Sequence, residues 1–292
     1  MPRNPPLLEI PSPFETAPGH LLLLEPPWAD IPALADAIAA GHYRKPFVLD
    51  DGERRYLHFS MRLTQSAMLK RRPNELDLRY TQKMMLFLLF VPRPQHIVLL
   101  GLGGGSLLKF CRHHLTHTRL VAVELDPDVI ALREAFAIPP DGDRQEIRQG
   151  DGVDYLAICR DRIDVLLVDA FDRTGLAPEL AGHAFFEDVV ARLSGGGVLV
   201  VNLAGDRSSY AGFIGAAMTA FDDRVIVMSV PEDGNHVLLA FRNPAFSPDW
   251  RRLRNIARQL SERYGLDFPS FVDKLERSDK LGLARREALR GG

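Results

Sequence analysis

A glycine-rich turn between two apolar segments is the strongest local feature of the sequence. Four glycines follow an apolar run over residues 97–100 and precede a second apolar stretch: Gly101, Gly103, Gly104 and Gly105. A buried strand that ends in glycines and opens a helix lets the backbone approach a ligand closely, beside N–H groups that have no partner within the helix. The turn therefore predicts a binding loop, although the same glycines would also suit an ordinary tight turn.

An acidic residue stands at the end of the next apolar run. Glu124 follows Gly101 at the spacing of about 20 residues at which an acid binds the hydroxyls of a ribose. Asp126 precedes Pro127, and we expect it only to cap the following helix. Glu124 has no such structural explanation, so its position favours a ribose-binding site.

Further acids follow the next two strand-like runs. Asp151 and Gly152 lie in a Gly-Asp-Gly turn, where the carboxylate either caps a helix or accepts a hydrogen bond from an adenine amino group. The apolar run over residues 165–168 then leads to Asp169 and Asp172. In a parallel sheet these positions share one edge. The crevice there would be acidic, and this favours a cationic ligand.

Alternating apolar and amphipathic segments predict how these residues are positioned. Apolar runs alternate with amphipathic stretches of about ten residues, which is typical of a parallel sheet covered on both faces. The runs span 97–100, 120–123, 165–168 and 198–201. Residues 224–230 and 236–241 predict an antiparallel hairpin that completes the sheet, and 249–265 and 270–290 predict surface helices.

The first quarter of the chain predicts a separate unit. Residues 1–30 are rich in proline and look irregular, whereas Asp51-Gly52 forms a hairpin signal between two strand-like runs. Residues 78–91 resemble a buried helix that closes at Pro92. We therefore expect a small N-terminal β-hairpin domain over residues 1–75, and an α/β domain over 76–292 whose first helix connects the two.

Composition sets the broad class. The chain has 292 residues, with 36 Lys+Arg against 38 Asp+Glu, and this near-neutral balance gives no reason to expect a nucleic-acid partner. Its longest apolar run is far shorter than the ~20 residues of a membrane span. No secretory signal is visible, and two cysteines favour a reducing compartment. We expect a soluble, cytoplasmic protein without a membrane partner.

Three histidines gather near the first helix of the α/β domain, at His113, His114 and His117. No acid is clustered with them, so we expect them to face solvent, and we expect no metal site. Residues 169–178 have the length and composition of a lid over the crevice or of an ordinary loop.

Taken together, these segments resemble class I S-adenosylmethionine-binding domains, and they look most like the spermidine synthase (polyamine aminopropyltransferase) family, in particular its divergent bacterial members. The resemblance covers about residues 48–241 and includes Leu-Gly-Leu-Gly-Gly-Gly, Val-Glu-Leu-Asp-Pro, Gly-Asp-Gly and Val-Asp-Ala-Phe-Asp. It implies a Rossmann-like class I methyltransferase sheet, and an enzyme that moves an aminopropyl group from decarboxylated S-adenosylmethionine to putrescine or a related amine in polyamine biosynthesis. It also implies a dimer or another homo-oligomer.

The resemblance assigns roles residue by residue. Glu124 would hold the ribose hydroxyls and Asp151 the adenine amino group, beside the glycine loop and Gly152. Asp172 would receive the proton of the attacking amine. Asp169 matches the paired acid before it, and Tyr80 matches the tyrosine that orients the amine.

Three departures from the family pattern keep two alternatives open. Gly104 replaces an aspartate that grips the donor's aminopropyl ammonium, Thr81-Gln82 replaces His-Glu, and Arg173 replaces a proline. The loss of acids favours, as alternatives, a methyltransferase that uses intact S-adenosylmethionine or a catalytically silent nucleoside- or polyamine-binding protein. The pattern specifies neither the acceptor amine nor the donor form.

Overall fold

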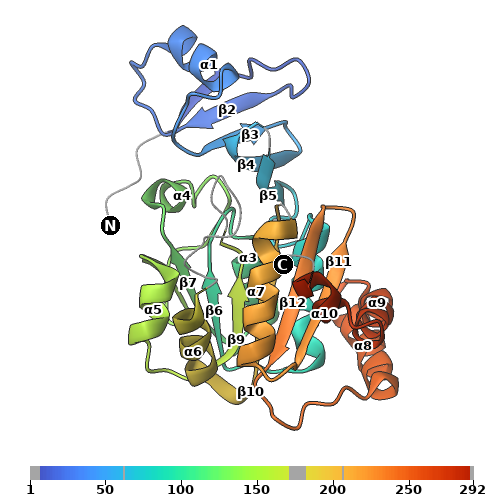
Figure 1. The fold of residues 1–292 in the computed structure, drawn as a ribbon. Coiled ribbons are helices and arrows are strands. Elements are labelled where there is room, and N and C mark those ends of the chain that lie inside the picture. The colour runs from blue at the N-terminus through green and yellow to red at the C-terminus, as the bar shows by residue number, and fades with distance from the viewer. Residues whose placement is uncertain (1–6, 62, 171–181, 206, 290–292) are drawn as a thin grey trace.

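The computed structural model describes residues 7–61, 63–170, 182–205 and 207–289 (Figure 1). It contains two sheets. The first is antiparallel, with five strands in the order β1-β2-β3-β4-β5. Its strands are β1 (Leu8–Pro11), β2 (His20–Leu23), β3 (Phe47–Asp50), β4 (Arg54–Ser60) and β5 (Leu63–Leu69). The predicted turn at Asp51-Gly52 joins β3 to β4, and Gly52 has the positive φ, +95°, that such turns require.

The second sheet has seven strands in the order β11-β12-β10-β9-β6-β7-β8. Strands β6 (His96–Leu100), β7 (Arg119–Glu124), β8 (Gln145–Gln149), β9 (Ile163–Val168) and β10 (Leu193–Leu203) run parallel, whereas β11 (Val225–Val230) and β12 (Asn235–Phe241) form an antiparallel hairpin beside β10. This arrangement confirms the predicted α/β fold with a mostly parallel sheet and a C-terminal hairpin.

The central strands are mostly apolar because both faces of the sheet are buried. In β9, Val165 and Leu167 belong to one core cluster, whereas Leu166 and Val168 belong to the other, and all four are fully buried. Successive side chains of a strand point to opposite faces, so a strand that is covered on both faces buries its side chains on each side, and this favours apolar residues.

Helices cover both faces (Figure 1). One core cluster contains residues of α3 (Ser106–His114), α4 (Pro127–Ala131), α8 (Trp250–Tyr264) and α9 (Phe268–Lys280). The other contains residues of α5 (Gly152–Ile158), α6 (His183–Arg192), α7 (Arg207–Ala220) and α10 (Leu283–Ala288). The helix expected over 270–290 is therefore two helices, separated at Gly282, whose φ of +60° ends the first of them.

One local expectation about the N-terminal region is wrong. Residues 1–30 were expected to be irregular, but within the part that is described, from residue 7 on, β1 pairs with β2, and Leu21 and Leu23 are fully buried. The prolines flank these strands rather than interrupt them, and Pro11 lies at the last position of β1. A further helix, α1 (Ile31–Ala39), follows and is capped by Asp30.

The segment expected as one helix over 78–91 consists of a short helix, α2 (Arg79–Met84), and a 3-10 helix, η1 (Met85–Leu89). Its side chains from Met84 to Leu89 are at most 4% exposed, which confirms that the apolar run is a buried core segment. Strand β5 ends at Leu69 and α2 begins at Arg79, so no element crosses residue 75. The division into domains at that residue stays a prediction.

Among the described residues, no helix is both long and apolar enough to cross a membrane.

Candidate functional site

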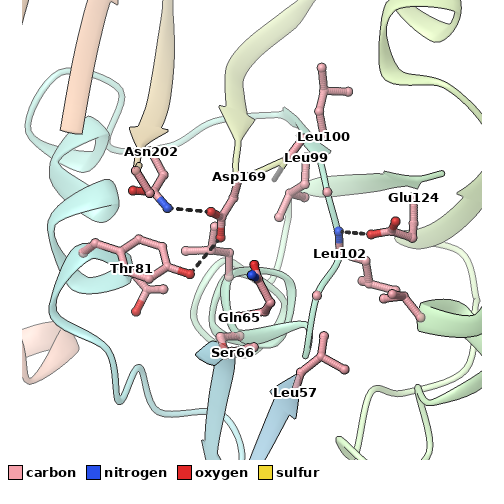
Figure 2. Close-up of a pocket in the computed structure, with 18 of the residues that line it drawn as sticks. Leu57, Gln65, Ser66, Thr81, Leu99, Leu100, Leu102, Glu124, Asp169 and Asn202 are labelled. Atoms are coloured by element: carbon pink, nitrogen blue, oxygen red, sulfur yellow. Dashed lines mark hydrogen bonds between the residues drawn. The ribbon is translucent and has the colours of Figure 1, made fainter. Parts of the chain in front are cut away.

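A cavity of about 850 Å³ lies at the carboxyl edge of the parallel sheet, where the glycine loop meets strands of the N-terminal sheet (Figure 2). The ends of β6, β7, β9 and β10 contribute Gly101, Glu124, Asp169 and Asn202 to its wall. Leu57 and Ser66 of β4 and β5 approach from the opposite side. Two parts of the chain that are far apart in sequence therefore enclose one site.

The glycine loop has the conformation and the crowding that glycine alone tolerates. Gly101, Gly103 and Gly105 have φ values of +93°, +50° and +67°. A Cβ at Gly101 would overlap the carbonyl oxygen of Asp169. The loop is thus packed directly against the backbone that carries an acid of the site.

Gly104 is restricted by space rather than by its backbone angle. A Cβ there would lie 2.7 Å from Ser66 Oγ and 2.9 Å from Phe136 Cδ1. A side chain at this position would therefore require Ser66 of β5 and the ring of Phe136 to move.

Glu124 fastens the glycine loop. Its Oε2 accepts the Leu102 N–H at 2.8 Å (Figure 2), and its Oε1 accepts the Asp126 N–H at 3.0 Å. Burial raises the pKa of Glu124 above its ordinary value, although backbone N–H groups oppose that shift. Each carboxylate oxygen can accept more than one hydrogen bond, so these contacts leave capacity for ribose hydroxyls. The ribose role stays a prediction.

Asp151 and Asp126 both cap helices. Asp151 Oδ1 accepts the N–H groups of Val153 at 2.6 Å and Asp154 at 3.3 Å, at the start of α5. Asp151 also lines the cavity, so the cap and the predicted adenine contact are compatible. Asp126 caps α4 through the Asp128 N–H at 2.8 Å, which confirms its predicted role.

Two side chains of the cavity wall donate hydrogen bonds to Asp169. Its Oδ1 accepts a hydrogen bond from Asn202 Nδ2 at 2.8 Å (Figure 2), and its Oδ2 accepts one from the Tyr80 hydroxyl at 3.1 Å. Burial raises the pKa of Asp169 to about 6, and these two hydrogen bonds limit the rise. The structure thus brings the predicted pair Tyr80 and Asp169 into contact.

The environment of Tyr80 keeps its hydroxyl protonated. Burial raises its pKa well above the ordinary value, and the negative charge of Asp169 adds to that effect. At neutral pH the hydroxyl is therefore a hydrogen-bond donor to the carboxylate.

Gly152, the last of the predicted site residues, also lies on the cavity wall. A Cβ at this position would lie 3.1 Å from Leu100 Cδ1.

Three further residues of the site were not predicted: Asn202, Asp233 and Asn235. Asn235 Nδ2 donates to Asn202 Oδ1 at 2.9 Å, and Asn202 in turn donates to Asp169. Asp233 Oδ2 accepts the backbone N–H of Tyr80 at 2.6 Å. The sequence signal for Asn202 was available, because it is a polar residue near the end of a buried apolar strand, at the binding edge of the sheet.

Within the described part of the chain, the cavity wall carries acids without bases. Its four carboxylates belong to Glu124, Asp151, Asp169 and Asp233, and no Lys, Arg or His of the described residues joins them. An uncompensated group of this kind favours a cationic ligand. Asp172 and most of the predicted lid, residues 169–178, lie outside the described residues.

The histidines of α3 and the loop after it form no site. His113 and His117 are exposed as expected, but His114 is half-buried, with its ring 4.4 Å from that of Phe110. No cluster of His, Cys, Asp or Glu that could hold a metal ion occurs among the residues that the structure describes.

The family model and the curated relatives agree on one family. A family model described as "Spermine/spermidine synthase domain" matches residues 78–205. The chain is 38% identical over 234 residues to a polyamine aminopropyltransferase from Chromobacterium violaceum, which covers 80% of this chain and 90% of the relative. A polyamine aminopropyltransferase from Neisseria meningitidis is 36% identical over the same length, covering 80% of this chain and 89% of the relative.

Solved structures show the same fold. A probable spermidine synthase from Corynebacterium glutamicum has a TM-score of 0.64 at 20% identity, covering 80% of this chain and 93% of that one. A spermidine synthase in complex with the transition state analogue AdoDATO has a TM-score of 0.63 at 16% identity, covering 84% and 86%. Human methyltransferase-like protein 13 in complex with SAH has a TM-score of 0.59 at 22% identity, covering 64% and 93%. The predicted methyltransferase-like architecture is confirmed.

Proposed function

The chain belongs to the polyamine aminopropyltransferase family, and we propose that it transfers an aminopropyl group from decarboxylated S-adenosylmethionine to putrescine or a related amine. The observation that supports this most strongly is the acidic cavity wall, which carries four carboxylates and no basic residue among those described. Both substrates of the reaction are cations, one a sulfonium with an ammonium tail and the other a protonated amine. A wall of one charge sign concentrates such ligands.

The donor would bind along the glycine loop and the ends of β7 and β8. Glu124 is assigned to the ribose hydroxyls and Asp151 to the adenine amino group. Gly101, Gly103, Gly104 and Gly105, with Gly152, are assigned to the donor by the family pattern. Gly101, Gly103 and Gly152 line the cavity, where their backbone can approach a ligand closely. Glu124 supports this assignment because it holds the loop in place while it lines the cavity.

The amine acceptor must lose a proton before it attacks. Its ammonium has a pKa near ~10, like that of lysine. A carboxylate that positions the ammonium and takes the proton makes the nitrogen nucleophilic, and the new C–N bond forms as the C–S bond breaks. The leaving thioether is neutral, so no acid is needed. We assign the proton to Asp172 by the family pattern, and the orientation of the amine to Asp169 and Tyr80.

The contact between Tyr80 and Asp169 supports the second part of that assignment. The carboxylate is fixed by the hydroxyl at 3.1 Å and by Asn202 at 2.8 Å, so it need not reorganise when the amine arrives. With a pKa of about 6, it is mostly ionised at neutral pH and attracts an ammonium.

The site around Gly104 favours a second candidate, methyl transfer from intact S-adenosylmethionine. Ser66 and the backbone of Gly104 present no carboxylate that would repel the donor's own carboxylate. Binding of both donors to the purified protein discriminates, because tighter binding of the carboxylated form indicates a methyltransferase. Nucleoside binding without turnover of either donor would instead indicate a silent binding protein.

The direct test of aminopropyl transfer uses the decarboxylated donor with a panel of diamines. Methylthioadenosine is the product expected, and Asp172→Asn is the control that should abolish it. Absence of product above this control would contradict the proposal.

We also propose that the protein acts as a cytoplasmic homo-oligomer. Free, buried Cys111 and Cys159 suit a reducing compartment, and Trp28 and Ile31 leave apolar surface 84% and 42% exposed on the N-terminal part. Light scattering at several concentrations tests the assembly.

A further inference from the structure

Two neighbouring acids in the turn between β11 and β12 have different surroundings. Glu232 binds two lysines, with Lys83 Nζ at 3.0 Å and Lys274 Nζ at 3.4 Å. Asp233 lines the cavity instead, and no cation among the described residues forms an ion pair with it. Both lysines thus form ion pairs with Glu232, whereas no described cation neutralises the charge of Asp233 on the cavity wall.

Asp233 is held in place by a hydrogen bond to Tyr80, which connects it to Asp169. Its Oδ2 accepts the backbone N–H of Tyr80 at 2.6 Å, and the hydroxyl of the same tyrosine donates to Asp169 at 3.1 Å. On the other side, Asn235 of the same hairpin reaches Asp169 through Asn202. The two carboxylates therefore stand at opposite ends of one tyrosine residue, at a separation fixed by two independent connections.

We propose that Asp233 binds the second ammonium group of a diamine acceptor while Asp169 faces the first, so that Asp233 selects a short aliphatic diamine over a monoamine. The inference rests on the proposed function and adds a specificity-determining residue to it. A diamine cation neutralises both carboxylates, and a charge-assisted hydrogen bond at each end fixes its register in the cavity.

A monoamine of the same length would lack the contact between its second end and Asp233. Its methyl end would face an unpaired, partly buried carboxylate, which loses water without gaining a partner. Sites built for a polar group reject analogues that lack it far more strongly than they reject a change of one methylene. Because Asp233 is only half-buried, we expect a discrimination of about tenfold rather than the largest values of this kind.

Asp233 also caps α2, because Leu78 at the N-cap position has no side chain that can accept a hydrogen bond. This capping uses Oδ2 and needs an acceptor oxygen rather than a charge. Asp233→Asn keeps such an oxygen and removes the charge, so it separates the two roles. Glu232→Gln is the matched control, because it removes the neighbouring charge outside the cavity and leaves an oxygen for Lys83.

The test compares kcat/KM for 1,4-diaminobutane and butylamine in the wild type and both variants. We expect Asp233→Asn to lower the value for the diamine about tenfold through KM, and not to lower that for butylamine, because the carboxylate that disfavours its methyl end is gone. Glu232→Gln should preserve the wild-type ratio. An unchanged ratio in Asp233→Asn, or an equal loss for both amines, would overturn the inference.

Two further measurements keep the test decisive. Asp233→Glu restores the charge on a longer side chain, so the preference should move toward 1,3-diaminopropane. If no amine yields methylthioadenosine in the wild type, the proposed function fails. Thermal stabilisation by 1,4-diaminobutane still tests Asp233 in that case. The wild type and Glu232→Gln should be stabilised and Asp233→Asn should not. Equal stabilisation of all three proteins would refute the role of Asp233.

Discussion

Asn202 offers a graded perturbation of the site, because it holds one oxygen of Asp169 without being a charged group itself. Its Nδ2 donates to Asp169 Oδ1 at 2.8 Å, and its side chain is buried, with 2% exposure. Asn202→Leu keeps a side chain of similar size and removes the donor. The pKa of Asp169 should then rise above its value of about 6, because burial remains while one of the opposing hydrogen bonds is lost.

The size of the shift follows from the strength of that bond. A hydrogen bond to a charged group contributes about 1.5–3 kcal/mol, and one pKa unit corresponds to ~1.4 kcal/mol. Allowing for partial exposure to the cavity, a rise of about one unit is expected. At pH 6 the ionised fraction of Asp169 would fall from about one half to about one tenth. A reaction that needs this carboxylate ionised would slow about fivefold at pH 6 and by less than twofold at pH 8.

The assay is the pH profile of kcat/KM for methylthioadenosine formation. The acid limb of Asn202→Leu should move upward by about one pH unit, while the plateau at high pH stays close to that of the wild type. Asn235→Ala removes only the outer bond, to Asn202 Oδ1, and should move the limb less. An acid limb that coincides in Asn202→Leu and the wild type would refute the reasoning, as would a plateau lowered without any shift.

Two other predictions concern the loop and the helix below it. Gly101→Ala should weaken donor binding at least a hundredfold by calorimetry, because its Cβ overlaps the Asp169 carbonyl, whereas Gly103→Ala, with its nearest atom at 3.8 Å, should weaken it less. Equal effects would contradict this. Burial lowers the pKa of Lys109 from 10.5 to about 7, so between these values the unfolded chain binds a proton that the folded chain lacks. The free energy of unfolding should therefore rise with pH above pH 7, and Lys109 should contribute ~1.4 kcal/mol per pH unit to this rise. In Lys109→Met this contribution should be absent, as measured by urea unfolding. A constant difference between the two proteins would contradict it.

The sequence predicted the parallel sheet because burial on both faces leaves an uninterrupted apolar signal. Residues 165–168, for example, alternate between two core clusters and allow no polar side chain. Strands β1 and β2 were missed because they are short and lie among prolines, and because β2 pairs with β3, whose residues lie more than twenty positions away. Composition alone does not report such pairing.

The acids of the site could be placed because each ends a parallel strand, and the topology brings those ends together. Glu124 and Asp169 follow this rule. Asp233 and Asn235 do not, because Asp233 lies in a hairpin turn and Asn235 begins β12, and the position of this hairpin beside α2 is set by packing between distant segments. For Asp151 the sequence offered a helix cap and a ligand contact as alternatives, but its carboxylate caps a helix and also lines the cavity, so the two roles do not exclude each other.

The most direct test of the central claim is a single product analysis with both donors. The purified protein is incubated with 1,4-diaminobutane and either decarboxylated or intact S-adenosylmethionine, and the nucleoside products are separated. The acidic cavity and the family membership predict methylthioadenosine from the decarboxylated donor, with the amine extended by one aminopropyl group. Methylthioadenosine from neither donor, with S-adenosylhomocysteine formed from the intact one, would contradict the account.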